Sequence, residues 1–403
     1  MGTIEYIVLL VFFIMFAWFV LVYYVHDEKE RKTLFTIFLL ALALRIVVAL
    51  LVHALIKPGF FAPDEPGIIY NGKGAADLWV SSGSFYARVD SPATAAEIIF
   101  YLFGFKPAIL FLFVNFLGAL TVLNIYFIAR RLFNVESARY SALVVAVLPS
   151  LVLWSSIASK DPYTQFLISF AVHLLLRIKE RFRIGNVILL LSSIALIAFF
   201  RRYLLVIVVL GALSMLIPYR KKTFVRDIII IAIFGFAAAA LSSSYSAKSL
   251  LSTGASGSVL EQLQETRSAF YQGGSKMLGH INVANPVDAV MYSPLLLAVF
   301  FLAPFPWDIS ASIIHNLATA ESLVWYYFLF YALKGIKSSL KEGKFDIMPV
   351  VVMIGVLSVA YALALTNIGA AYRFRAQVSV LLLTFSGYGI YVRNRERIKK
   401  HSM

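Results

Sequence analysis

The chain has 403 residues, of which 61% are hydrophobic, and it carries a formal net charge of +15 at pH 7. Soluble domains are nearer about 45–50% apolar, so the excess predicts that much of this chain faces lipid. There is no cysteine, which excludes disulfides, thiolate chemistry and cysteine-based metal sites.

Apolar runs of about 20 residues recur along the chain, long enough to cross a hydrocarbon core of roughly 30 Å. The first carries Glu5 and has neither a basic start nor a small-residue cleavage site, so we expect it to be retained. The runs lie near residues 4–25, 34–56, 107–128, 140–157, 162–178, 185–200, 203–218, 227–243, 287–304, 320–334, 346–366 and 374–392. This pattern predicts an all-α polytopic membrane protein.

Basic residues gather in short connections between the apolar runs. Six connections hold 23 of the 36 Lys and Arg residues, a distribution typical of cytoplasmic loops rather than of nucleic-acid binding. They are 26–33, 129–139, 177–186, 219–226, 334–344 and 393–401. We therefore place all six on the cytoplasmic side, with the N-terminus outside and the C-terminus inside.

Three apolar runs lie between the connections 219–226 and 334–344. An odd number of crossings cannot join two loops on the same side of the membrane. One of 227–243, 287–304 and 320–334 therefore does not span. We expect it to be 287–304, which is interrupted by Pro294 and bracketed by two further prolines. The prediction is about 11 transmembrane helices plus one re-entrant or interfacial segment.

The outer interval 57–106 begins with two adjacent carboxylates, Asp64 and Glu65, between Pro63 and Pro66. Proline restricts the backbone on both sides, so we expect these acids on a rigid turn. Two carboxylates on a fixed turn beside a membrane indicate a catalytic device, although an ordinary solvated loop has the same composition.

Five basic residues lie where apolar runs meet the outer face. A charge at such depth costs on the order of 2.5–3.5 kcal/mol, so it usually faces a cavity or a partner. Together these cations would suit a phosphate, which arginine binds with two parallel hydrogen bonds. They are Lys160, Arg201, Arg202, Arg373 and Arg375.

Other interpretations of these cations stay open. Lys160 would pair with Asp161 at a helix start, and the arginines would extend to lipid headgroups. Arg373 and Arg375 share a side on an extended turn but diverge on a helix. Arg45, inside an apolar run, is expected to make a structural contact within the helix bundle.

The order of several motifs resembles the GT-C membrane glycosyltransferases, in the branch that contains protein O-mannosyltransferases and the lipid A aminoarabinose transferase. The resemblance covers roughly residues 35–390. Its motifs are the DE pair followed by Tyr70, then VNFLGALTVLNIYFIARRLF, VLPSLVLWSSIASKDPY, FLAPFPWD and YRFRAQ. It implies a core over 34–392 with outer loops 57–106 and 244–319, preceded by an extra helix and cytoplasmic loop in 1–33 and followed by a basic cytoplasmic tail, 393–403.

The resemblance also implies roles. Asp64 matches the catalytic base and Glu65 the second acid of the pair, while Tyr70, Asp90 and Glu97 are candidates for an acceptor contact or a further acid. The implied donor is a polyprenyl-phosphate sugar, used on the extracytoplasmic side of the cell membrane. No cofactor is expected, because the DxD metal motif of oligosaccharyltransferases is absent and the six histidines form no i, i+4 pair. A divalent metal stays open.

Glycosyl transfer needs an activated acceptor, a stabilised leaving phosphate and the exclusion of water. Asp64 would take the acceptor proton, and the five cations would stabilise charge on the departing phosphate. Direct displacement predicts inversion at the anomeric carbon. The acceptor is a protein, a lipid or a glycan, and no nucleic acid is expected as a partner. Two alternatives stay open: an O-antigen-type polysaccharide polymerase or ligase, and a transporter or flippase for lipid-linked substrates.

Overall fold

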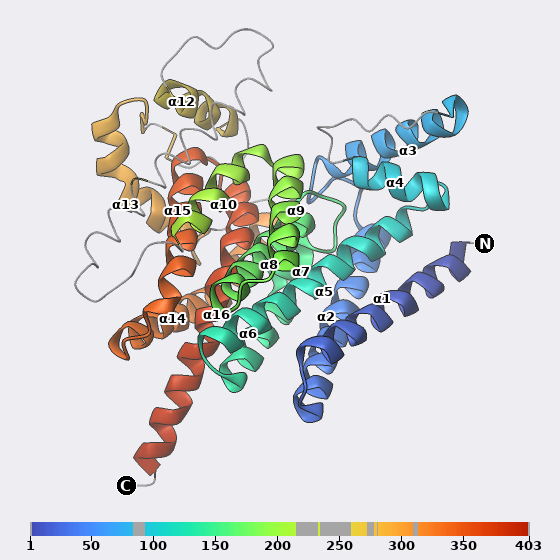
Figure 1. Cartoon of the computed structure of the whole chain (residues 1–403). Helices are drawn as coiled ribbons and strands as arrows, with labels where there is room; N and C mark the ends of the chain where they lie inside the picture. The colour runs from blue at the N-terminus through green and yellow to red at the C-terminus, as the bar shows by residue number, and fades with distance from the viewer. Residues whose placement is uncertain are drawn as a thin grey trace.

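The computed structural model describes residues 2–83, 93–214, 233, 259–271, 278, 279, 281–308 and 313–401. Every regular element in these ranges is helical (Figure 1). The helices are α1 (Gly2–Tyr24), α2 (Glu28–Leu55), α3 (Glu65–Ser82), α4 (Thr94–Phe103), α5 (Pro107–Leu132), α6 (Val135–Val147), α7 (Pro149–Trp154), α8 (Asp161–Glu180), α9 (Ile184–Phe200), α10 (Arg202–Ser214), α12 (Val259–Phe270), α13 (Pro286–Leu302), α14 (Ile313–Lys341), η2 (Phe345–Ile347), α15 (Met348–Ala364) and α16 (Ile368–His401).

Within the described ranges, four helical stretches are long and apolar enough to cross a membrane, which indicates a multi-pass membrane protein. They are Thr3–Tyr24, Glu28–Leu55, Pro107–Leu132 and Phe345–Ala364. The count of about eleven crossings stays a prediction, since the run 227–243 lies outside the described residues apart from Ile233. α13 continues through Pro294 as one helix of 17 residues, which is short for a crossing.

The apolar run 140–157 is two helices rather than one. α6 ends before Leu148, whose extended backbone (φ −62°, ψ 121°) leads into Pro149 at the start of α7. A residue before proline avoids helical backbone angles, so the chain changes direction at this point. The non-helical stretch 155–160 then joins α7 to α8, and it carries part of the candidate site.

α5 lies at the centre of one half of the bundle, where it packs against α2, α6 and α8, while α16 packs along α14 and α6. The predicted structural role of Arg45 is confirmed at this centre. Its Nε donates to Ser155 Oγ at 2.7 Å, and its Nη1 donates to the Ala146 carbonyl at 3.3 Å. Arg45 therefore links α2 to the end of α7 and fixes where the stretch 155–160 begins.

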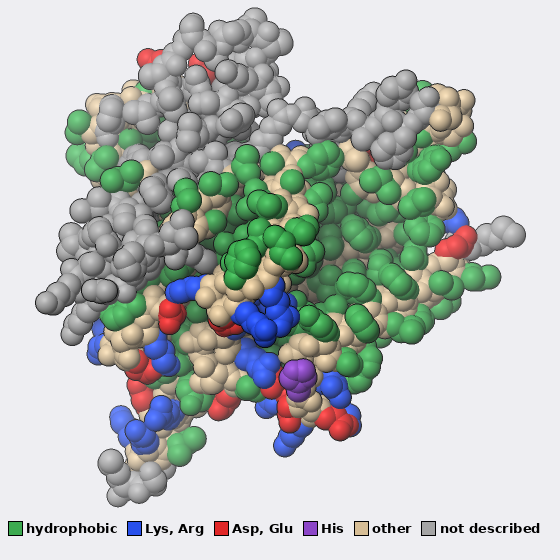
Figure 2. Space-filling model, viewed as in Figure 1, with side chains coloured by type: hydrophobic (Ala, Val, Ile, Leu, Met, Phe, Trp, Pro, Cys, Tyr) green, Lys and Arg blue, Asp and Glu red, His purple; other side chains and the backbone are tan. Residues whose placement is uncertain are grey.

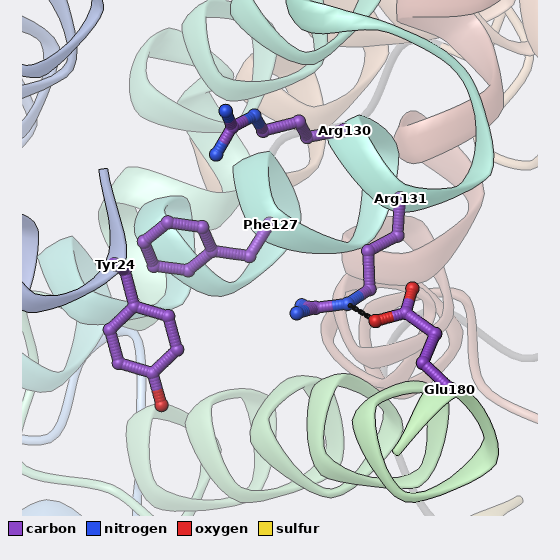
Figure 3. A pocket seen from close by; sticks show the side chains of 5 residues that line it. All are labelled: Tyr24, Phe127, Arg130, Arg131 and Glu180. Atoms are coloured by element: carbon purple, nitrogen blue, oxygen red, sulfur yellow. Dashed lines mark hydrogen bonds and ion pairs between the residues drawn. The ribbon is translucent and has the colours of Figure 1, made fainter. Parts of the chain in front are cut away.

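Charged side chains gather at the lower end of the bundle in Figure 2, below a largely apolar band. A cavity of about 200 Å³ at this end is lined by Tyr24, Phe127, Arg130, Arg131 and Glu180 (Figure 3). Its arginines are paired within the protein: Arg131 Nε lies 2.9 Å from Glu180, and Arg130 Nε lies 3.1 Å from Glu30. The 17 residues of α9 extend about 25 Å away from this end and finish beside Arg201.

Candidate active site

The two adjacent acids begin α3 instead of lying on an isolated turn. Asp64 is the residue before the helix, Glu65 is its first residue, and Pro66 follows within the first turn. The sequence predicts both acids on a rigid turn: Asp64 does lie in the turn before α3, whereas Glu65 is already helical. Pro66 is compatible with this, because the N–H that proline lacks is unpaired in the first turn of any helix. The helix start aims the two acids in different directions.

Glu65 is buried and ties three segments together. Its Oε1 accepts a hydrogen bond from the Ala158 backbone N–H at 3.1 Å and lies 3.0 Å from Nε2 of His53. His53 belongs to α2 and Ala158 to the stretch before α8. Glu65 thus holds the beginning of α3 against both, while the Asp64 side chain keeps 36% of its surface exposed.

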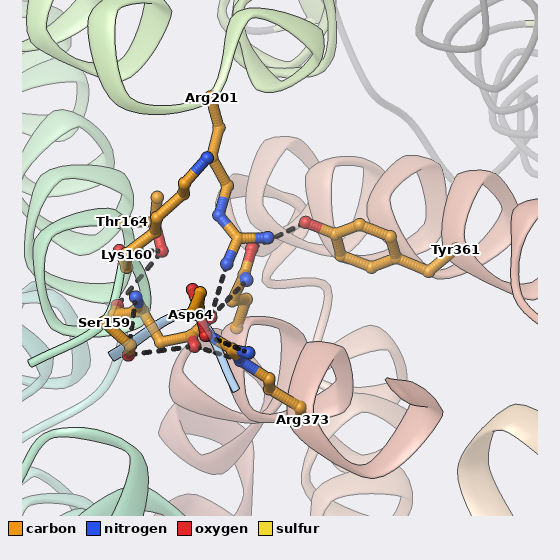
Figure 4. A network of polar contacts seen from close by, with 9 residues as sticks. Asp64, Ser159, Lys160, Thr164, Arg201, Tyr361 and Arg373 are labelled. Carbon is orange, nitrogen blue, oxygen red and sulfur yellow. Dashed lines mark hydrogen bonds and ion pairs between the residues drawn. The ribbon is translucent and has the colours of Figure 1, made fainter. Parts of the chain in front are cut away.

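Asp64 is paired with Arg373, which lies 309 positions further along the chain. Nη1 of Arg373 donates to Oδ1 at 3.0 Å and Nη2 donates to Oδ2 at 3.1 Å, which is a two-point contact between guanidinium and carboxylate. Nε of the same arginine donates to Oδ2 of Asp161 at 2.5 Å. Arg373 therefore bridges two acids, one partly exposed and one buried (Figure 4).

Asp161 is the buried centre of this network and has no exposed surface. Its Oδ1 accepts from Nη2 of Arg201 at 2.7 Å and from Nε2 of Gln377 at 3.1 Å. Its Oδ2 accepts from Ser159 Oγ at 3.2 Å, in addition to Arg373. A buried charge is tolerated only with such partners, and here two cations and two neutral donors supply them.

Lys160 is half-buried beside this network. Burial lowers the pKa of Lys160, the charge of Arg201 lowers it further, and the carboxylate of Asp64 offsets part of that effect. The lysine is therefore a cation that loses its proton more readily than an exposed lysine does.

Aromatic rings support the two arginines. The guanidinium carbon of Arg373 lies 5.2 Å from the centre of the Trp154 ring, and that of Arg201 lies 4.8 Å from the Phe374 ring. Such contacts restrict a guanidinium without adding an anion that would compete for it. They hold the cations of the site in fixed orientations.

Arg375 lies apart from the acids. Arg373 and Arg375 both belong to α16, and side chains two positions apart on a helix diverge by about 200°. Nη1 of Arg375 donates to the carbonyls of Phe301 and Ala303 at 2.8 and 2.7 Å, and its guanidinium carbon lies 5.2 Å from the Trp325 ring. This residue fixes the end of α13, and phosphate binding by it stays a prediction.

The remaining candidates are placed as follows. Tyr70 lies on α3 with 68% of its surface exposed, whereas Glu97 is buried in α4, which packs against α3. Arg202 begins α10, but its side chain is outside the described residues, as is all of Asp90. The roles predicted for these four residues are untested by the geometry.

Three residues of the network were not singled out as site residues from the sequence: Asp161, Ser159 and Gln377. Asp161 was interpreted only as a helix cap or a partner of Lys160, although an acid between two apolar runs meets the same depth argument that selected the cations. Ser159 and Gln377 lie within motifs that carry the family resemblance, but nothing in those motifs marks either residue as a donor to Asp161. Among the described residues there is no group of three or more His, Asp or Glu side chains able to hold a metal ion.

Residues 92–245 match the family model of dolichyl-phosphate-mannose-protein mannosyltransferases, a range that includes Lys160, Asp161 and Arg201. The chain is also similar to the crystal structure of an Archaeoglobus fulgidus oligosaccharyltransferase in complex with Zn and sulfate. That likeness has 14% identity and a TM-score of 0.38. It covers 86% of this chain but only 44% of the other. No curated protein matches. Over residues 92–245 the chain is thus similar to a family of GT-C membrane glycosyltransferases, which supports the resemblance seen in its motifs.

Proposed function

We propose that the protein transfers a sugar from a polyprenyl-phosphate donor to an acceptor hydroxyl on the extracytoplasmic side of the membrane, with inversion and with Asp64 as general base. The observation that carries this proposal is the meeting of Asp64 with Arg373 and, through Asp161, with Arg201. An acid able to accept a proton and cations able to hold a phosphate thus lie in one place.

The roles follow from exposure and charge. Asp64 is the more exposed of the two acids, so it can reach an acceptor hydroxyl and take its proton as that oxygen attacks the anomeric carbon. The bond from the anomeric carbon to the phosphate oxygen breaks at the same time, and its electrons pass to the phosphate. Arg373 and Lys160 would stabilise that charge in surroundings where water is scarce.

Buried residues hold these groups in place. Asp161 fixes Arg373 and Arg201 relative to one another, and Glu65 fixes the start of α3 and so the position of Asp64. We assign both acids to positioning. A base placed within hydrogen-bond reach contributes about 10²–10⁴-fold to such a reaction, so small displacements matter.

The side of the membrane is inferred from charge. The paired arginines at the end of α5 lie at the other end of the bundle from Arg201, about 25 Å along α9. Basic residues favour the cytoplasmic side, which would direct the Asp64 network outward. The apolar donor tail would then lie among helices that already face lipid.

The test uses the purified chain in lipid nanodiscs with a panel of polyprenyl-phosphate hexoses and pentoses and with hydroxyl acceptors of three kinds, a peptide, a glycan and a lipid, and it measures release of polyprenyl phosphate. Asp64→Asn should lose transfer by about 10²-fold or more while keeping the thermal transition of the wild type. Asp77→Asn is the matched control, since Asp77 is an exposed acid on the same helix. Transfer that survives in Asp64→Asn would show that Asp64 is not the base. Activity that survives the loss of both Asp64 and Glu65 but not the loss of Arg373 would indicate a polymerase or ligase.

A further inference from the structure

The guanidinium of Arg373 is already bound on two edges. Its Nη1 and Nη2 both contact Asp64, and its Nε contacts Asp161. A phosphate oxyanion binds arginine best through two parallel hydrogen bonds, which need one whole edge. A donor phosphate can therefore gain that contact only by displacing one of the two acids.

Asp161 is the harder acid to displace. It is fully buried and also accepts hydrogen bonds from Arg201, Gln377 and Ser159. Breaking its contact with Arg373 would leave a buried charge short of partners, without access to water. The helix start that carries Asp161 is fixed in addition by the contact of Glu65 with the preceding stretch.

Asp64 is the easier acid to displace. In the described part of the chain, both hydrogen bonds accepted by its carboxylate come from Arg373. Its side chain is 36% exposed, so a released carboxylate regains water. A phosphodiester and a carboxylate carry the same single negative charge, so the exchange leaves the charge around Arg373 unchanged.

We infer that the donor phosphate displaces Asp64 from Arg373 and by doing so releases the base. This rests on the proposed function, because it takes the lipid phosphate as the ligand of Arg373. Before the exchange, each oxygen of Asp64 accepts an N–H and is poorly placed to take a proton. After it, the carboxylate is open to the acceptor. Donor binding thus precedes activation of the acceptor.

The inference makes Asp64 an internal competitor of the donor. Removing its charge should therefore tighten the binding of a bare lipid phosphate, even though the same change abolishes transfer. We expect a three- to tenfold lower Kd, about the effect of losing one partly exposed, charge-assisted pair. A residue that only binds substrate would show the opposite change, since its loss weakens binding.

The experiment titrates farnesyl phosphate into the full chain, held in phosphatidylcholine nanodiscs, for the wild type, Asp64→Asn, Asp64→Ala and the control Asp77→Asn. Both Asp64 variants should bind three- to tenfold more tightly than the control, which should match the wild type. Equal or weaker binding by both Asp64 variants overturns the exchange.

A second arm titrates inorganic phosphate, which has no lipid tail. The same ratio of Kd values between Asp64→Asn and Asp77→Asn is expected at a weaker absolute affinity, because the competition is for the charge alone. Tighter farnesyl phosphate binding without any sugar transfer by the wild type would refute the proposed function and keep the exchange. Transfer that depends on Asp64, with binding unchanged between Asp64→Asn and the control, would refute the exchange and keep the proposed function. Absence of binding in every variant overturns the exchange, and absence of transfer as well overturns the proposed function.

Discussion

Nε of Arg373 lies 2.5 Å from Oδ2 of Asp161, an acid 212 positions earlier in the chain that has no exposed surface. The other oxygen of the same acid accepts from Arg201 at 2.7 Å. One carboxylate is therefore shared by two guanidiniums at the place where α8, α16 and the joint between α9 and α10 meet. The stability of the bundle and the geometry of the proposed site depend on the same contact.

Asp161→Asn should destabilise the protein strongly. The amide keeps the shape of the side chain but removes the buried charge that Arg201 and Arg373 share, so both cations lose the ion pair with this acid while Arg373 keeps the one with Asp64. We expect a loss of about 3–5 kcal/mol, seen as a lower temperature of thermal unfolding in detergent. Ser159→Ala removes one neutral donor from the same acid and should cost only about 0.5–1.5 kcal/mol. Equal shifts in the two variants would contradict a shared counterion.

Arg373→Lys and Arg375→Lys should separate catalysis from stability. Lysine keeps the charge but cannot make the two-point contact with Asp64 and bridge to Asp161 as well, so transfer should fall by about 10–100-fold, and the unfolding temperature should fall less than in Asp161→Asn. Arg375→Lys should retain transfer within a few-fold and lower the unfolding temperature, because the carbonyls of Phe301 and Ala303 lose their shared donor. Transfer rates and unfolding temperatures measured on the same samples decide this, and a large loss of transfer in Arg375→Lys would restore its predicted phosphate role.

Lys160 should make phosphate binding sensitive to alkaline pH. Its pKa is lowered from the ordinary 10.5, mainly by burial, so its charge is lost at lower pH than that of an exposed lysine. Affinity for farnesyl phosphate should fall as the pH rises through that lowered value. The stability of the ligand-free protein should instead rise over the same interval, since the unfolded chain binds more protons there than the folded one.

The control for this prediction is Lys160→Met, which should bind phosphate more weakly and lose both pH dependences. Affinity is measured by titration at a series of pH values, and stability by thermal unfolding in the same buffers. A wild type whose affinity follows the ordinary titration of an exposed lysine would show that Lys160 is not close to the phosphate.

Depth in the membrane selected Arg201 and Arg373 from the sequence, because an unpaired charge there is costly whatever the fold. In the structure both arginines contact Asp161, and their role as phosphate ligands stays a prediction. The same argument was not applied to Asp161, so the acid that joins them was missed. Arg373 and Arg375 diverge because both lie after the start of α16 at Ile368, and the sequence left open whether this segment is helical or extended.

The elements of the fold were predictable to a similar degree. Apolar runs marked α1, α2, α5 and α15 because length and hydropathy suffice for a crossing. The break between α6 and α7 also had a local signal in Pro149, since the residue before proline avoids helical angles. What the sequence could not indicate is Glu65 turning inward to Ala158 while its neighbour Asp64 faces Arg373, which only long-range packing decides.

Gly118→Ala should destabilise the protein and weaken phosphate binding together. A Cβ atom on Gly118 would lie 2.6 Å from Nε of Arg45 and 2.7 Å from Oγ of Ser155, the two atoms that form the hydrogen bond between α2 and the end of α7. Overpacking of this kind costs about 1–3 kcal/mol, and the displaced Ser155 leads directly into the stretch that carries Lys160. Gly74→Ala is the matched control: nothing lies within 4 Å of its added Cβ, and alanine favours a helix interior by about 1 kcal/mol. Unfolding temperatures should therefore move in opposite directions, and a Gly118→Ala protein that unfolds and binds like the wild type would show that Arg45 and Ser155 do not set the position of the site.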